Sequence, residues 1–388
     1  MTEANDLKSA LVLDYTHQLG MFLRWDFFDF LFTIHLVLPQ RFQEHDLDYV
    51  YDPKKETTGS SYDFKYTDCC TRVYLFLSHT RVCPCSVEKM YKPLRALVAK
   101  KVVSGFAVAV FTYGGQDKSK TETLMGNGEN MGVAGLMIKD IFVYCAKDKK
   151  KFAISISMKL VEICDEQVQD LLSENPVQFG SSIGGCVEME SQAVPVQTPD
   201  DALSIARNAV MSKSVRMQGK ASHVVQVIQI TAESLNKKRP LTKMGKLTLV
   251  DTTDDAHLAE LKEIVKVQAL HQRARESSKK SKNLPPMPRR RSPLTRLMAE
   301  AIGGNCKTVM LLHTYPSDPL APSTMEFASY LKSVENDSIV NVETAALKKL
   351  KQQLAKLVEL QDKRAGGGDE DPWWSPSNLP SVSRPGAA

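Results

Sequence analysis

Lys120 and Thr121 are the residues best placed for chemistry, because they follow an apolar run and a glycine-containing turn. Residues 107–112 are predicted to form a buried strand, and the frame Gly114-x-x-x-x-Ser119-Lys120-Thr121 follows it. In this pattern, main-chain N–H groups cradle phosphate, the lysine reaches its outer oxygens and the hydroxyl holds Mg²⁺. The spacing therefore predicts a nucleotide-binding loop of Gly114, Gly115, Gln116, Asp117, Lys118, Ser119, Lys120 and Thr121.

The loop departs from the pattern at two positions that matter for affinity. Asp117 would repel a triphosphate by about 1–4 kcal/mol per charge pair at ~4 Å, part of which Lys118 offsets. Ser119 stands at the second glycine, whose backbone conformations a serine reaches only at a cost. Two interpretations stay open, namely weak binding of ATP with Mg²⁺ and a purely structural strand, loop and helix.

The surrounding pattern alternates strands with helices. Residues 152–158, 224–230, 247–250 and 309–313 are predicted strands. Thr198 followed by Pro199, Asp200 and Asp201 predicts the start of a helix over residues 202–211. Leu258, Leu261, Ile264 and Val265 mark the apolar face of another helix. The order predicts an α/β fold.

Composition argues for a globular protein. The 388 residues are 43% hydrophobic and 24% charged. The most apolar stretch, residues 21–38, contains Arg24, Asp26 and Asp29, so that we expect buried core rather than a membrane span. The sequence shows no charged leader with a small-residue cleavage site, which together with the cysteine pattern predicts a cytoplasmic protein.

Eight cysteines without a regular framework indicate reduced thiols. One cluster could suggest a zinc site, namely Cys69, Cys70, His79, Cys83 and Cys85. It contains no C-x₂-C pair, so we interpret its cysteines as ordinary thiols.

Positive charge is concentrated in one segment, residues 271–291. Glu276 is its only acid against eight cations, Arg273, Arg275, Lys279, Lys280, Lys282, Arg289, Arg290 and Arg291. Such a segment attracts an acidic polymer or surface over about 8 Å at physiological salt, unless it is simply a solvated loop. It contains no aromatic residue on which bases could stack, which argues against nucleic acid.

The C-terminal part predicts a helix followed by a tail. Residues 343–363 carry Leu347, Leu350, Leu354 and Leu357 at three-four spacing, a two-heptad stripe that suits either a weak homodimer or a helix packed on its own domain. Residues 366–388 are rich in Pro, Ser and Gly and are expected to be disordered.

Four blocks in order resemble the kinesin motor domain. They are residues 110–126, containing Val-Phe-Thr-Tyr-Gly and Lys-Thr; residues 156–172, containing Leu-Val-Glu-Ile-Cys-Asp-Glu; residues 292–308, with Ser-Pro-Leu-Thr-Arg-Leu and Gly-Gly-Asn-Cys-Lys-Thr; and residues 326–334. The resemblance implies a P-loop NTPase-like α/β fold with a central, mostly parallel or mixed sheet between helices. It also implies an extension over 1–32, a motor-like domain over 33–341, a neck-like helix over 342–365 and a tail over 366–388.

The switch motifs of that family are largely replaced. Switch I, N-x-x-S-S-R-S-H, aligns with residues 216–223 and keeps only Ser222 and His223. Switch II, D-L-A-G-S-E, aligns with residues 251–256 and keeps only Asp251, the residue on the metal side. The family's switch arginine and glutamate both fall on alanine, Ala221 and Ala256. Loss of one partner alone would leave a buried charge unpaired at ~3–5 kcal/mol, so joint loss is expected once the pair is abandoned.

These observations predict a kinesin-like protein of the cytoplasmic microtubule cytoskeleton, with ATP hydrolysis impaired or absent and the fold acting mainly as a microtubule-binding module. Lys120, Thr121 and Asp251 would hold any nucleotide and Mg²⁺, and the eight cations would face the acidic tubulin surface. No residue is assigned a catalytic role. The alternative is an active motor that tolerates these substitutions.

Overall fold

The computed structural model describes residues 32–38, 41–47, 49–51, 71–77, 87–88, 91–114, 119–127, 131–173, 175–180, 188–216, 222–238, 240–253, 256–276, 284–314 and 320–344, with short pieces between 346 and 357. The chain divides into two compact units, residues 1–342 and 343–388. The predictions for residues 1–31, for the cysteine cluster from Cys69 to Cys85 and for the tail lie outside the described residues.

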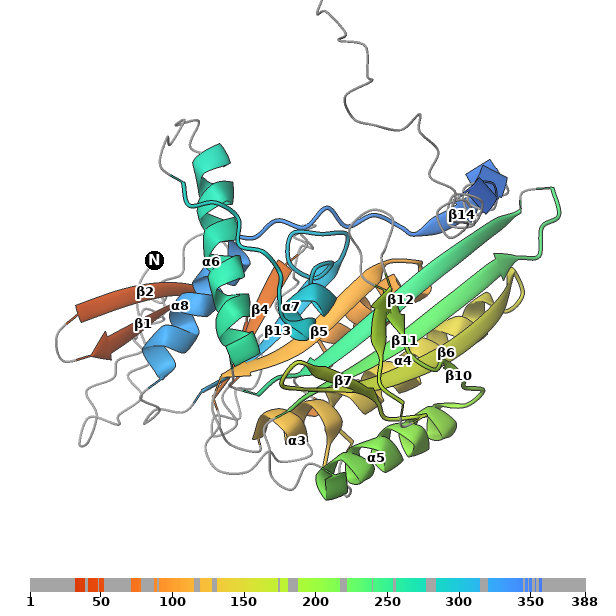
Figure 1. The fold of residues 1–388 in the computed structure, drawn as a ribbon, viewed down its shortest axis with the longest axis horizontal. Coiled ribbons are helices and arrows are strands. Elements are labelled where there is room, and N and C mark those ends of the chain that lie inside the picture. The colour runs from red at the N-terminus through yellow and green to blue at the C-terminus, as the bar shows by residue number, and fades with distance from the viewer. Residues whose placement is uncertain are drawn as a thin grey trace, which may run out of the picture. The chain divides into compact units, whose positions relative to one another are not determined.

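A mixed sheet forms the centre of the first unit (Figure 1). Its strands lie in the order β10, β6, β11, β12, β5, β13, β4, β3, with β12 to β3 parallel and β10, β6, β11 and β12 antiparallel. This confirms the predicted α/β fold. The bounds of these strands are β3 Tyr49–Tyr51, β4 Thr71–Leu77, β5 Ala107–Gly114, β6 Phe152–Cys164, β10 Val194–Pro195, β11 His223–Ser234, β12 Leu241–Asp251 and β13 Lys307–Thr314. Two further short strands are β7 Gln167–Asp170 and β14 Val342–Thr344.

Two small antiparallel sheets lie apart from the main one. They pair β1 Phe32–Leu38 with β2 Arg41–Leu47, and β8 Gln178–Gly180 with β9 Glu188–Glu190. The helical elements are η2 Ala96–Lys100, α2 Lys101–Val103, α3 Ser119–Met125, α4 Val133–Asp148, α5 Pro199–Arg216, α6 Ala256–Glu276, α7 Pro293–Leu297 and α8 Ala321–Lys332.

Helices cover both faces of the main sheet. The side chains of β5 point alternately into the two hydrophobic cores, one on each face. Val108 and Val110 pack in the core shared with η2, α2, α3, α4 and α5. Ala107, Ala109 and Phe111 pack in the core shared with α6, α7 and α8. The two-residue period of a strand thus places β5 at the centre of a three-layered domain.

Local sequence signals explain where the helices begin. The main-chain N–H of Asp201 donates to Thr198 Oγ1 at 3.1 Å and the N–H of Thr198 donates to Asp201 Oδ2 at 3.0 Å, which confirms the predicted start of α5. Leu258, Leu261, Ile264 and Val265 are buried on one face of α6, also as predicted.

Among the described residues no group of His, Cys, Asp and Glu could hold a metal ion by itself. Within the same residues, no helix has the length and apolar character needed to cross a membrane. The free thiols of Cys145, Cys164 and Cys306 are buried, and burial raises the pKa of Cys145 and of Cys306 to about 12. These two thiols are therefore protonated and inert near neutral pH.

Gly114 fixes the direction in which the chain leaves β5 toward α3. Its φ is +101°, and a Cβ there would lie 1.9 Å from the carbonyl oxygen of His313 on the neighbouring strand β13. Only glycine fits this combination of a left-handed conformation and close backbone approach.

Replacing Gly114 with alanine is predicted to lower the free energy of unfolding by about 3 kcal/mol, because strain and backbone displacement add. Urea unfolding measures the difference. Ala109→Gly in the same strand is the matched control and should cost only about 1 kcal/mol. Equal losses in the two variants would contradict the role assigned to Gly114.

Candidate functional site

The carboxylate of Asp251 joins three elements at the end of the central strands. Thr112 Oγ1 on β5 donates to Asp251 Oδ1 at 3.0 Å, and Thr121 Oγ1 on α3 donates to Asp251 Oδ2 at 2.6 Å. Asp251 itself ends β12 and is 7% exposed. Each carboxylate oxygen therefore has a hydroxyl donor, which holds the first turn of α3 against the ends of β5 and β12.

A second layer of hydrogen bonds fixes the residue after Asp251. The main-chain N–H of Thr252 donates to Thr112 Oγ1 at 3.1 Å, and Thr252 Oγ1 donates to the carbonyl oxygen of Thr112 at 2.6 Å. Thr112 therefore locks the end of β12 to β5. This role of Thr112 was not predicted from the sequence, in which residue 112 is only the last residue of an expected buried strand.

The phosphate-binding residues predicted from sequence are only partly described. Lys120 lies in the first turn of α3 and is 5% exposed, and Thr121 follows it beside Asp251. Gly115, Gln116, Asp117 and Lys118 lie outside the described residues, as does the side chain of Ser119. The hydroxyl and carboxylate oxygens brought together here are ligands that suit Mg²⁺, so that Lys120, Thr121 and Asp251 fit a nucleotide with its metal.

The two surviving switch I residues bond inward. Ser222 Oγ donates to Glu162 Oε1 on β6 at 2.6 Å, within the core. The main-chain N–H of Thr253 donates to His223 Nδ1 at 3.0 Å, which joins the remnants of switch I and switch II. The other aligned switch positions, 217–221, 254 and 255, lie outside the described residues.

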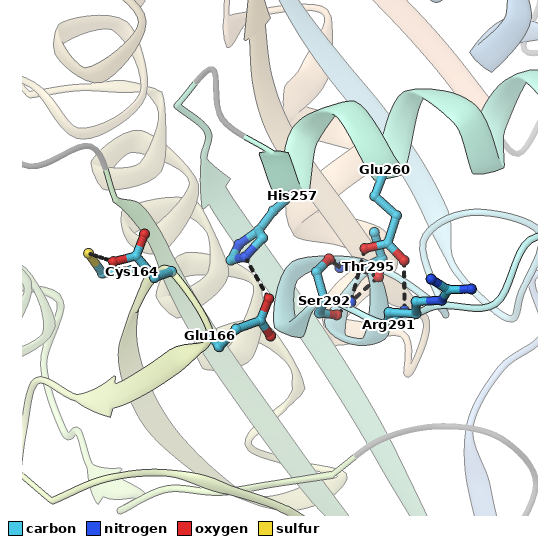
Figure 2. Close-up of polar contacts among 8 residues, drawn as sticks. Cys164, Glu166, His257, Glu260, Arg291, Ser292 and Thr295 are labelled. Carbon is cyan, nitrogen blue, oxygen red and sulfur yellow. Dashed lines mark hydrogen bonds and ion pairs between the residues drawn. The ribbon is translucent and has the colours of Figure 1, made fainter.

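A histidine pair lies next to the positions where the family has its arginine and glutamate. The rings of His223 and His257 are stacked with centroids 5.9 Å apart, and His257 Nε2 lies 3.6 Å from Glu166 Oε1 (Figure 2). Glu166 comes from the turn between β6 and β7 and is largely exposed. Sequence reasoning did not single out His257 or Glu166, because this contact depends on a turn about 90 residues away along the chain.

Glu260 anchors the end of the cationic segment to α6. It accepts hydrogen bonds from the main-chain N–H groups of Arg291 at 2.7 Å and Ser292 at 2.9 Å (Figure 2). Burial acts to raise the pKa of Glu260, but these bonds and those from the Ser292 and Thr295 side chains outweigh it, so that its pKa lies below the ordinary value. His271 Nε2, 2.7 Å from the carbonyl oxygen of Pro285, ties the same segment to α6 further along.

The predicted microtubule-facing arginines differ in their surroundings. Arg275, Arg289 and Arg291 are exposed. Arg273 is also exposed, but its guanidinium donates to Ser333 Oγ at 2.8 Å and lies 5.4 Å from the ring centroid of Tyr330.

Arg290 has an internal role. Its guanidinium donates to the carbonyl oxygens of Thr295 at 3.2 Å and Ile302 at 2.9 Å, and burial lowers its pKa. Lys279, Lys280 and Lys282 lie outside the described residues.

A buried strand ending in glycine, a helix carrying lysine and threonine, and a neighbouring strand ending in aspartate define an α/β protein of the P-loop class. The kinesin motor domain family model matches residues 50–336, and the chain belongs to that family. Because the match begins at residue 50, the expected start of the domain at residue 33 stays a prediction.

Three similar proteins are plant kinesins. Kinesin-like protein KIN-14H of Arabidopsis thaliana is 28% identical over 312 residues, which is 74% of this chain and 29% of that protein. Kinesin-like protein KIN-14G of Arabidopsis thaliana is 28% identical over 329 residues, 76% of this chain and 32% of the relative. Kinesin-like protein KIN-14P of Oryza sativa subsp. japonica is 28% identical over 307 residues, which is 72% of this chain and 30% of that protein. The chain spans less than a third of the length of these relatives.

Glu260→Gln should destabilise the domain at neutral pH by about 1 kcal/mol, since solvent screens a half-exposed carboxylate. Because the folded pKa of Glu260 is depressed, its stabilisation is present above the ordinary value of 4.5 and is lost as pH falls below it. Urea unfolding of both proteins from neutral to acidic pH measures this difference. A gap that does not narrow in acid would contradict the assigned role of the carboxylate.

Proposed function

We propose that this chain is a kinesin-like microtubule-associated protein whose motor fold acts mainly as a microtubule-binding module, with ATP hydrolysis impaired or absent. One observation carries the proposal. The switch positions that form the family's closing ion pair are Ala221 and Ala256, while the neighbouring His223 and Thr253 are bonded to each other.

The nucleotide side of the proposal rests on the cluster around Asp251. Lys120 would meet the phosphates, and Thr121 with Asp251 would lie on the Mg²⁺ side. ATP with Mg²⁺, when bound, supplies the free energy of phosphoryl transfer. Asp117 in the loop would reduce the affinity, because ~1.4 kcal/mol of repulsion corresponds to tenfold.

Hydrolysis requires more than binding, because catalysis of phosphoryl transfer depends on positioned water and on groups that stabilise transition-state charge. Thr253 and Asp254 stand where the family has alanine and the glycine that senses the γ-phosphate, and alanines replace both members of the ion pair. A bound triphosphate would therefore lack the partners that close the site around the attacking water.

The proposed binding to microtubules rests on exposed arginines on α6 and next to it. Arg275, Arg289 and Arg291 are exposed, and the bonds from Glu260 and His271 fix the path of the chain that carries Arg289 and Arg291. Arg290 is excluded from the proposed interface because it donates to internal carbonyl oxygens. Fixed positive charge of this kind is complementary to the acidic surface of tubulin.

Two further proposals extend the same reading of the chain. Leu347, Leu350 and Leu357 are exposed at 38%, 61% and 59%, which supports a weak homodimer through the C-terminal helix. The cysteine pattern supports a cytoplasmic, cytoskeletal location. Neither proposal is needed for microtubule binding by the motor fold.

An active ATP-driven motor is the second candidate function. The observation in its favour is the intact contact of Thr121 with Asp251 at 2.6 Å, which keeps the metal side of the site in order. The two functions differ in whether microtubules accelerate phosphate release.

Phosphate release by the purified chain should stay at background with and without microtubules, because the groups that respond to the γ-phosphate are replaced. Lys120→Ala should leave this rate unchanged while it weakens binding of a fluorescent ATP analogue at least tenfold, about 1.4 kcal/mol. Microtubule-stimulated release that vanishes in Lys120→Ala would establish the active motor instead.

Cosedimentation with microtubules should show binding that weakens as salt increases. Reversing Arg275, Arg289 and Arg291 to glutamate should reduce affinity about tenfold or more, since each exposed pair is worth up to ~1 kcal/mol. Arg207→Glu is the matched control, because Arg207 is exposed on α5, on the other face of the sheet. Pelleting that does not depend on salt, or an equal loss of microtubule affinity in both variants, would overturn the proposed interface.

A further inference from the structure

A second concentration of positive charge lies on elements at the end of the sheet opposite to α3, and Figure 1 shows where these elements lie. It is formed by the exposed face of α4 from Lys139 to Lys147, by the turn between α4 and β6 and by the turn between β11 and β12. We call it the lysine platform and define it by seven exposed lysines: Lys139, Lys147, Lys149, Lys150, Lys151, Lys237 and Lys238.

Main-chain hydrogen bonds hold the two turns together. The N–H of Leu235 donates to the carbonyl oxygen of Lys151 at 3.0 Å, and Phe152 pairs with Ser234 where β6 and β11 meet. The N–H of Lys238 donates to Asn236 Oδ1 at 3.0 Å within the second turn. Lysines that are more than 80 residues apart in the sequence therefore lie in two turns that hydrogen bonds join.

The platform has a large excess of positive charge. Its seven lysines face two nearby acids, the half-buried Asp148 and the exposed Glu233, which leaves an excess of five positive charges. Like charges gathered on joined elements repel one another, and bound negative charge relieves that repulsion. An anionic partner would thus stabilise the arrangement.

Aliphatic side chains are exposed among the lysines. Leu235, in the turn after β11, is 56% exposed, and Val143 is 46% exposed one helical turn before Lys147 on α4. Lys147 Nζ lies 5.0 Å from the ring centroid of Tyr144. Both α4 and the turn after β11 thus expose an aliphatic side chain as well as lysines.

The platform is far from the switch residues. Phe152 begins β6 and Cys164 ends it, and Ile163 next to Cys164 pairs with His223. The 13 residues of this strand span about 40 Å at ~3.3 Å per residue. A partner bound at the platform therefore leaves the nucleotide site and the arginines beside α6 free.

We propose that the lysine platform binds the surface of an anionic membrane. Its described cations are lysines, whose compact ammonium groups attract negative charge without the directional fork of arginine, and Arg239 of the same turn lies outside the described residues. They lie in two turns and along the exposed face of α4, and the exposed Leu235 can enter the interface. A cluster of four to eight basic residues of this kind is typical of proteins that bind acidic phospholipids.

The test is sedimentation of the full chain with vesicles of phosphatidylcholine, with and without phosphatidylserine. Binding is expected only with phosphatidylserine and should fall as salt increases. Replacing Lys149, Lys150 and Lys237 with glutamate should reduce vesicle affinity at least tenfold, because three cations become repulsive. Leu235→Ser should reduce it about threefold through loss of apolar contact.

The matched control reverses the three exposed arginines Arg275, Arg289 and Arg291 and should bind vesicles like the unaltered chain. The lysine variant should keep its melting temperature and its pelleting with microtubules, which separates this proposal from the proposed function. Equal vesicle binding by the lysine variant and the unaltered chain, or no binding to phosphatidylserine, would overturn the proposal. Tighter binding of soluble polyglutamate than of vesicles would also overturn it, because the partner would then be an acidic polypeptide.

Discussion

The carboxylate of Asp251 is the contact on which the arrangement of the site depends. Thr112 and Thr121 each donate to one of its oxygens, and the three residues come from the ends of β5, α3 and β12. A buried carboxylate without donors would cost several kcal/mol, so these hydroxyls and the charge stabilise one another. The same contact that would position a metal ion therefore also holds the sheet and its first helix together.

This double role fits the sequence, in which Lys120, Thr121 and Asp251 match the family motifs while positions 221 and 256 do not. Lys120, Thr121 and Asp251 lie where β5, α3 and β12 meet, and their replacement would disturb packing as well as binding. Positions 221 and 256 are both alanine. The chain fills part of the region with its own contacts, namely the hydrogen bond from the main-chain N–H of Thr253 to His223 and the approach of His257 to Glu166.

Local pattern predicted much of the fold. Residues close together in the sequence determine the strands over 152–158 and 224–230 and the helix start at Thr198. The structure has these elements at the predicted positions, and both strands are longer than predicted. Contacts between distant segments were not predictable in this way. Thr112 looked like an ordinary strand residue, and Arg290 like another surface cation, because neither sequence context reveals the carboxylate or the carbonyl oxygens that tertiary packing brings to them.

The central claim is that the chain keeps the phosphate and metal half of the site and has lost the half that responds to the γ-phosphate. Calorimetric titration with ADP and with ATP, each with and without Mg²⁺, tests it most directly. The account predicts that Mg²⁺ strengthens binding and that the two nucleotides bind within about threefold of each other, less than ~1 kcal/mol. A preference for ATP of more than about tenfold, or binding that is indifferent to Mg²⁺, would contradict it.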